Sequence, residues 1–206
     1  MDKIFQVEPS ISDDDIKNVN NYMSSGSWIT ESRVTRELEN SIKSYLSRDY
    51  AVAVPNGTIA IYLSLLAAGV KEGMKVGIPN LTMIATINAV LWAKAEPVLI
   101  DVNEDLCLSY QQLVILKDEL DCVIFVPLNG RTSEGEDIKD WCSDNEIILV
   151  EDSAHALGSN YENSKCGSLG DLSILSFTPH KIITMGQGGM ILTDNEEFYN
   201  LSLIHI

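Results

Sequence analysis

Short apolar runs alternate with stretches of helical periodicity along most of the chain. The runs predict strands at 51–54, 75–78, 97–100, 122–126, 147–150, 172–176 and 190–193. Apolar residues at helical spacing predict helices between them, near 58–68, 82–93, 109–118 and 134–145. Strands that are apolar on both faces and joined by helices form a mainly parallel sheet that is covered on both sides. The pattern therefore predicts an α/β fold with a three-layer, mainly parallel sheet.

Two helices are expected before the first strand. The polar segment Ser12–Asp15 is typical of a helix N-terminus, and its helix is predicted to extend to about Met23. The second helix is indicated by apolar residues at helical spacing, namely Val34, Leu38, Ile42, Tyr45 and Leu46. The sequence contains no internal repeat and no low-complexity linker.

The chain is strongly acidic. Its 206 residues include 14 basic and 30 acidic side chains, which give a formal net charge of −16, while 45% of the residues are hydrophobic. This is the composition of a globular protein. So acidic a surface argues against binding to nucleic acid or to an anionic lipid surface. An anionic ligand would therefore depend on helix N-termini and a few placed cations.

The four cysteines are scattered, with neither C-x-x-C spacing nor a histidine at metal-ligand spacing, so no metal site is expected. The start of the chain has no basic segment followed by an apolar one. The most apolar stretch, 51–70, is interrupted by Pro55, Asn56 and Gly57, which argues against a membrane helix. We therefore expect a reduced, cytoplasmic protein.

Ligands of such sheets bind at the carboxyl ends of the strands, and polar residues lie there. Gly57 and Thr58 stand where the strand at 51–54 ends and the next helix begins. Glycine lets the backbone approach a ligand, and a hydroxyl beside free N–H groups at a helix N-terminus suits phosphate. The same residues also suit an ordinary capped turn.

Glu151 and Asp152 directly follow the strand at 147–150. Two carboxylates at the end of a buried strand are costly unless one has a cationic partner. Asp152 could hold the proton of a heterocyclic nitrogen, and His155 could reach the same ligand. A helix cap with a hydrogen-bonded histidine explains this segment equally well.

Lys181 lies between the last two predicted strands, two residues after Pro179 and shortly before the glycines of 186–189. A lysine held in such a loop can have a lowered pKa and form a Schiff base. A lysine taken alone is more often a surface charge. A catalytic or metal-binding role for His180 would need partners that the sequence does not identify.

The three segments together have the order of pyridoxal phosphate enzymes: a phosphate cradle, an aspartate at a strand end, then a lysine about thirty residues later. The chain resembles the DegT/StrS family of PLP-dependent sugar aminotransferases, which has the aspartate-aminotransferase-like fold (fold type I). The resemblance runs from about Pro9 to Asn200. It is carried by Ser25-Gly26, Ile29-Thr30, Asn56–Thr58, Pro79–Thr86, Pro97–Asp101, Glu151–Ala156, Gly167–Asp171 and Lys181–Gly189.

The resemblance implies a role for each matching residue. Lys181 would bind the aldehyde of pyridoxal 5'-phosphate and move a proton between substrate and cofactor carbons. Asp152 would pair with the pyridinium nitrogen, and His155 would lie near the phenolic oxygen. The phosphate would be held by three residues, Gly57, Thr58 and Ser176.

Three positions bear on how closely the chain follows the family. Met83 stands where the family usually has an aromatic residue stacked on the cofactor ring; a thioether can pack on such a face, with altered stacking. Gln187 stands where glutamate is commoner. A related branch of sugar 3-dehydratases has histidine in place of the Schiff-base lysine, so Lys181 favours transamination over dehydration.

The resemblance also implies a homodimer and a C-terminal small domain, which we expect to be absent from this sequence. We expect a PLP-binding large domain with an N-terminal helical segment over residues 1–200. Residues 201–206 read Leu-Ser-Leu-Ile-His-Ile, which one frame of a sequencing-library transposon end encodes. They are therefore expected to be a non-native tail on a truncated sequence.

The implied activity is the transfer of an amino group from an amino acid, expected to be glutamate, to a keto group of a nucleotide-linked deoxysugar. Polysaccharide biosynthesis is the usual setting of the family. Two alternatives stay open: an inactive fragment of such an enzyme, and a PLP-dependent sugar dehydratase on the same scaffold.

Overall fold

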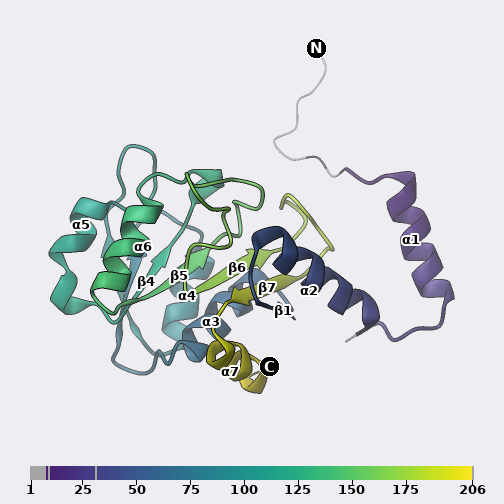
Figure 1. Cartoon of the computed structure of the whole chain (residues 1–206), viewed down its shortest axis with the longest axis horizontal. Helices are drawn as coiled ribbons and strands as arrows, with labels where there is room; N and C mark the ends of the chain where they lie inside the picture. The colour runs from purple at the N-terminus through teal and green to yellow at the C-terminus, as the bar shows by residue number, and fades with distance from the viewer. Residues whose placement is uncertain (1–7, 9, 31, 206) are drawn as a thin grey trace, which may run out of the picture.

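A computed structural model describes residues 8, 10–30 and 32–205. In this part of the chain, seven strands form one sheet in the order β1-β7-β6-β5-β4-β2-β3 (Figure 1). The strands are β1 (Tyr50–Val54), β2 (Lys75–Pro79), β3 (Glu96–Ile100), β4 (Cys122–Phe125), β5 (Ile148–Asp152), β6 (Leu172–Ser176) and β7 (Gly189–Thr193). Neighbours are parallel, except that β7 is antiparallel to both β1 and β6. The predicted α/β fold with a mainly parallel sheet is confirmed.

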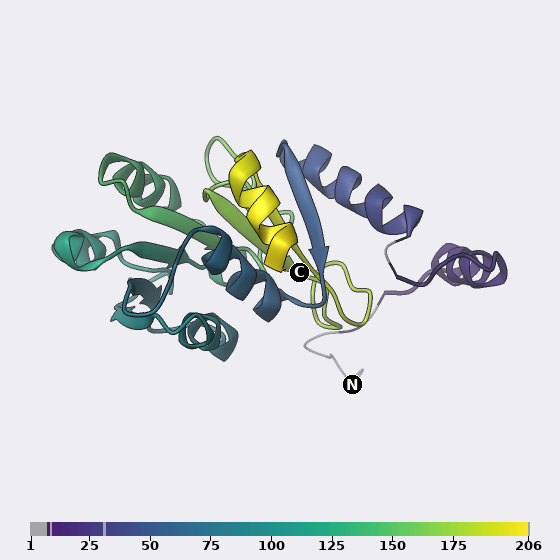
Figure 2. The ribbon, with the colours of Figure 1, turned by 90° about the horizontal axis from the view of Figure 1, so that it is seen from below.

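Helices cover both faces of the sheet. They are α1 (Asp13–Ser24), α2 (Arg33–Leu46), α3 (Gly57–Ala67), α4 (Ile84–Trp92), α5 (Tyr110–Ile115), α6 (Gly135–Asp144) and α7 (Glu196–His205), with 3-10 turns at Lys117–Glu119 and Leu128–Gly130. Helices α3, α4 and α7 share a core with one face, and α5 and α6 pack on the other, where α2 covers the β1 end. Figure 2 shows α7 and α2 on opposite sides of β1.

The alternation of side chains along the central strands explains this layering. On β4, Ile124 belongs to the core under α3 and α4, whereas Val123 and Phe125 belong to the core under α5 and α6. All three side chains are fully buried. Because successive strand residues point to opposite faces, an uninterrupted apolar run needs helices on both sides.

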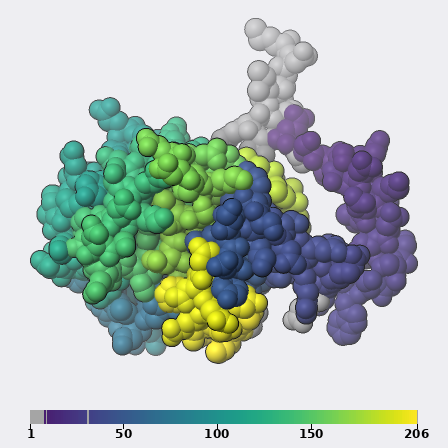
Figure 3. Space-filling model, viewed as in Figure 1, coloured from purple at the N-terminus to yellow at the C-terminus, as the bar shows by residue number. Residues whose placement is uncertain are grey.

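Helix α1 stands apart from these layers. Its N-terminus has the expected cap: the Ser12 hydroxyl accepts from the Asp15 N–H, and the Asp15 carboxylate accepts from the Ser12 N–H at 2.8 Å. None of its residues is buried. Figure 3 shows the helix projecting from the body of the molecule.

Most boundaries shift by one or two residues from the prediction, and three differences are more informative. Strand β5 runs from Ile148 to Asp152 instead of 147–150, because Glu151 and Asp152 continue the parallel pairing with β6. The predicted helix at 109–118 divides into α5 and a 3-10 turn. Helix α7 was not predicted, and it includes residues 201–205. Helical conformation does not test the expected non-native origin of 201–206, which stays a prediction; Pro9 and Ile206 lie outside the described residues.

Two glycines let the turn after β1 lie directly on the neighbouring strands. A Cβ atom on Gly189, at the start of β7, would lie 2.5 Å from the carbonyl carbon of Asn56. A Cβ atom on Gly57 would lie 2.8 Å from the Cβ atom of Ser176 at the end of β6. The N-terminus of α3 is therefore fixed against the end of β6 by contacts that no larger residue allows.

The loss in free energy of unfolding caused by a Leu→Ala substitution should depend strongly on how buried the leucine is. Leu172→Ala removes a fully buried side chain from β6, and we expect a loss of about 2–5 kcal/mol in the free energy of unfolding. Leu99→Ala, on edge strand β3, is the matched control: Leu99 is 60% exposed, and we expect a change within about 0.5 kcal/mol. Urea unfolding followed by circular dichroism measures both, and equal losses would contradict the described layering.

Candidate active site

A cavity of about 140 Å³ lies where β1, β5 and β6 end and where α4 begins. All the site residues predicted from the sequence line it: Gly57, Thr58, Met83, Asp152, His155, Ser176 and Lys181. Other lining residues include Asn56, Thr82, Val126, Thr178 and His180. The structure thus brings together segments that are more than a hundred residues apart in the sequence, while the individual roles stay predictions.

The N-terminus of α3 forms one wall of this cavity. Asn56 caps the helix, since its side-chain oxygen accepts from the Ile59 N–H at 2.9 Å. The N–H groups of Gly57 and Thr58 have no partner among the hydrogen bonds of the described residues. The expectation of a cap is met by Asn56, and the two free N–H groups beside the Ser176 hydroxyl leave a place for an anion.

Asp152 is buried at the end of β5, with 4% of its surface exposed. Its carboxylate accepts from the Thr86 hydroxyl at 3.1 Å and from the Ala154 N–H at 3.2 Å. Burial raises its pKa above the ordinary aspartate value, while these two donors and the charge of Lys181 act in the opposite direction. Two long hydrogen bonds leave the carboxylate with unused acceptor capacity beside the cavity.

Glu151, the preceding residue, is fully buried and differs sharply from Asp152. Its carboxylate accepts five hydrogen bonds of 2.6–2.9 Å, from the hydroxyls of Ser153, Tyr161 and Ser173 and from the N–H groups of Gly167 and Leu169. The sequence argument required a cationic partner for one of the two acids. Asp152 has the charge of Lys181 nearby, whereas Glu151 needs no cation, because five neutral donors replace the water that burial removes.

Lys181 and His155 are half-buried in the same cavity. Burial lowers the pKa of Lys181 below the ordinary lysine value, although the nearby Asp152 opposes this. Burial also lowers the pKa of His155, and the positive charges of Lys181 and His180 lower it further. The Nδ1 atom of His155 is buried and has no partner among the described residues. The cavity therefore holds a lysine amine that loses its proton more readily than an exposed one, and an imidazole nitrogen without a partner in the described residues.

Sequence reasoning assigned no role to Thr82 and Thr86, whose hydroxyl oxygens are 3.0 Å apart. Thr86 is fully buried, on the same side of α4 as Ala89 and Val90. A polar residue on the apolar side of a predicted helix was a signal that could have found it. Met83, at the N-cap of α4, is 55% exposed at the mouth of the cavity.

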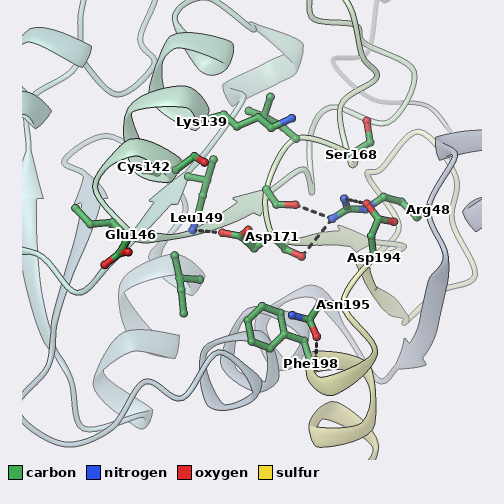
Figure 4. A pocket seen from close by; sticks show the side chains of 15 residues that line it. Arg48, Lys139, Cys142, Glu146, Leu149, Ser168, Asp171, Asp194, Asn195 and Phe198 are labelled. Atoms are coloured by element: carbon green, nitrogen blue, oxygen red, sulfur yellow. Dashed lines mark hydrogen bonds and ion pairs between the residues drawn. The ribbon is translucent and has the colours of Figure 1, made fainter.

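A larger hollow of about 830 Å³ lies at the opposite ends of β5 and β6 (Figure 4). Its polar groups bind one another: Arg48 donates to the Asp194 carboxylate and to the Gly170 carbonyl, both at 2.7 Å, and Asp171 accepts from the Leu149 N–H at 2.8 Å. Apart from Nε of Arg48, these groups have partners. We therefore interpret this hollow as a structural junction of strand ends.

Cys142 lines the larger hollow, and no cysteine of the described residues lines the cavity that contains Lys181. All four cysteines are buried and free, and burial raises their pKa values, to about 11 for Cys107 and to about 12 for Cys142 and Cys166. No group of three or more metal-ligating side chains occurs in the described residues. Within the same residues, no helix is long and apolar enough to cross a membrane.

Known proteins have a similar fold and a similar sequence. GDP-perosamine synthase from Escherichia coli O157:H7 is 33% identical over 199 residues, covering 95% of this chain and 54% of the relative. An aminotransferase from Psychrobacter cryohalolentis superposes with a TM-score of 0.89 at 27% identity, over 96% of this chain and 51% of its own. The NtdA structure from Bacillus subtilis, which has bound PMP, gives a TM-score of 0.84 at 27% identity, over 93% and 45%.

The sheet order and the antiparallel β7 give the fold of the PLP-dependent aminotransferases of fold type I. A sequence model described as the DegT/DnrJ/EryC1/StrS aminotransferase family matches residues 9–203. The chain belongs to that family, as its resemblance implied. It spans about half the length of the curated relatives that it matches.

The hydrogen bonds of Glu151 should be essential for stability. Glu151→Gln places an amide nitrogen against donors that need an acceptor, so we expect a loss of at least about 2 kcal/mol in the free energy of unfolding. Glu146→Gln, at an exposed position, is the control and should change it by less than about 0.5 kcal/mol. Urea titrations of both variants measure the difference, and a stable Glu151→Gln protein would contradict this interpretation.

Lys181 should lose its proton at a lower pH than an exposed lysine does. Because only the neutral amine reacts, competitive acetylation with trace acetic anhydride should reach half its maximum rate below the ordinary lysine pKa. Peptide mass spectrometry follows Lys181 and, as an internal comparison, exposed Lys71. A midpoint for Lys181 at or above that of Lys71 would show that burial does not control its protonation.

Proposed function

We propose that this chain carries the cofactor-binding part of a PLP-dependent aminotransferase that acts on a keto sugar attached to a nucleotide. The observation that carries the proposal is that Asp152 and Lys181 line one cavity with the N-terminus of α3. A strand-end carboxylate, an amine of lowered pKa and a phosphate-sized group of free donors are the three features that this cofactor requires.

The residues fit pyridoxal phosphate on three independent observations. The Gly57 backbone approaches Ser176 so closely that a side chain would fill the cradle. Asp152 is buried, with fewer donors than its oxygens can accept. His155 has a buried ring nitrogen without a partner. Each feature is costly in an isolated chain, and a ligand with a phosphate, a protonated ring nitrogen and a polar ring oxygen satisfies all three.

When bound, pyridoxal phosphate supplies an aldehyde that takes up and passes on an amino group, and a ring that stabilises charge at the reacting carbon. In the proposed site, Lys181 would condense with the aldehyde carbon, with release of water, and would move the proton. Asp152 would keep the ring nitrogen protonated. His155 would lie near the ring oxygen, Gly57, Thr58 and Ser176 would hold the phosphate, and Met83 would pack on the ring.

The substrate class follows from relatives. Three curated relatives bear the name GDP-perosamine synthase, so a nucleotide-linked sugar is the proposed acceptor and an amino acid, glutamate, the proposed donor. Lys181 in the cavity favours transamination over dehydration. We also propose a homodimer, a cytoplasmic location and a role in polysaccharide biosynthesis. Four free, buried thiols are consistent with a reducing compartment.

The first experiment measures the visible absorbance of the purified chain with added PLP, before and after borohydride reduction, followed by peptide mass spectrometry. We expect an absorbance band and reduced cofactor attached to the peptide that contains Lys181. Lys181→Ala should abolish both. Lys71→Ala, at an exposed site outside the cavity, should abolish neither.

Addition of glutamate to the loaded chain then tests amino transfer, as a loss of the same band. Attachment at Lys181 without this loss would support an inactive fragment that still binds cofactor. Attachment spread over surface lysines, and unchanged in Lys181→Ala, would contradict the proposed site.

A further inference from the structure

The two buried acids of β5 have different surroundings, and one donor to Asp152 comes from another element. Glu151 has five donors, whereas Asp152 has two. One of these two is the hydroxyl of Thr86, which is fully buried on α4. Through this contact a helix that begins at the end of β2 reaches the end of β5.

The direction of the hydrogen bonds around Thr86 follows from proton counting. A threonine hydroxyl has one proton, and an ionised carboxylate can only accept. The Thr86 hydroxyl therefore donates its hydrogen bond to Oδ2 of Asp152, and its oxygen accepts from the Thr82 hydroxyl 3.0 Å away. Thr82 lines the cavity. A relay from Thr82 through Thr86 to Asp152 in this direction matches the ionised form of Asp152.

We propose that Thr86 is a positioning residue for Asp152: its hydroxyl, supported by Thr82, fixes Oδ2 to α4 and keeps the carboxylate ionised toward the cavity. The identity of the group that Asp152 then faces rests on the proposed function. The relay itself is a property of this chain without any ligand. Valine has nearly the shape of threonine, so a role in packing alone would not require the hydroxyl.

Several groups act on Asp152 besides Thr86. Burial and the charge of Glu151 favour its protonated form, whereas the Ala154 N–H and the charge of Lys181 favour its ionised form. His155 and His180 also line the cavity. These contributions to the pKa of Asp152 have both signs. A hydrogen bond to the charged form lowers this pKa, so the loss of one such bond has a measurable effect.

The test is a carboxyl carbon NMR titration of the cofactor-free chain with labelled aspartate, in which Asp152→Asn identifies the Asp152 signal. We expect Thr86→Val to raise the pKa of Asp152 by about one to two pH units, the size expected for a lost hydrogen bond to a charged group. Thr86→Ser should restore a value close to that of the unmodified chain. Thr132→Val, a half-buried threonine outside the cavity, should leave it unchanged.

An unchanged midpoint in Thr86→Val, or an equal rise in Thr86→Ser, would overturn the proposal. If Thr86→Val does not fold, Thr82→Val removes the upstream donor from a half-buried position and should give a smaller rise, and no rise would again overturn it. The titration needs no cofactor. A failure of PLP to attach to Lys181 would therefore contradict the proposed function and leave this result standing.

Discussion

The hydrogen bonds of Glu151 are the interaction on which the site depends. Five donors converge on a carboxylate that has no exposure to water; four of them come from the segment between β5 and β6, and the fifth, Ser173, lies in β6. The segment is thereby folded back onto the end of β5. Asp152 follows Glu151 in the strand, so its position is set by the same contacts. The hydrogen bonds of Glu151 hold this segment in place, and Asp152 keeps unused acceptor capacity.

A second constraint comes from the antiparallel strand β7. It lies between β1 and β6, and Gly189 at its start lies against Asn56. The turn after β1 is thus held at the same edge of the sheet as the end of β6. Because Gly57 contacts Ser176 directly, free N–H groups from α3 and a hydroxyl from β6 meet at one place. This contact is a consequence of packing density and needs no ligand to form.

Much of this was predictable from the sequence. The apolar runs predicted the strands, because strands buried on both faces are apolar throughout. The polar residues after them predicted the cavity, because the carboxyl ends of parallel strands lie at the same edge of the sheet. The end of β5 was missed since Glu151 and Asp152 look like loop residues, and only pairing with β6 keeps them in the strand. Helix α7 was missed as well: residues 201–206 were expected to be a non-native tail, and no element was predicted at 196–200. Thr86 stood out as a polar residue on the apolar side of a predicted helix, but its contact with Asp152 could not be predicted, because the two residues are 66 positions apart.

Because the chain is acidic, binding of an anionic ligand depends on the few groups in the cavity that can attract negative charge. Fourteen basic residues face thirty acidic ones, and among the lining residues Lys181 and two histidines carry the capacity for positive charge. Burial lowers the pKa values of Lys181 and His155, so both groups lose their protons more readily than exposed ones. The backbone N–H dipoles at the N-terminus of α3 attract an anionic group and do not titrate. Holding a phosphate and supplying an amine therefore fall to different elements, α3 and the loop that contains Lys181.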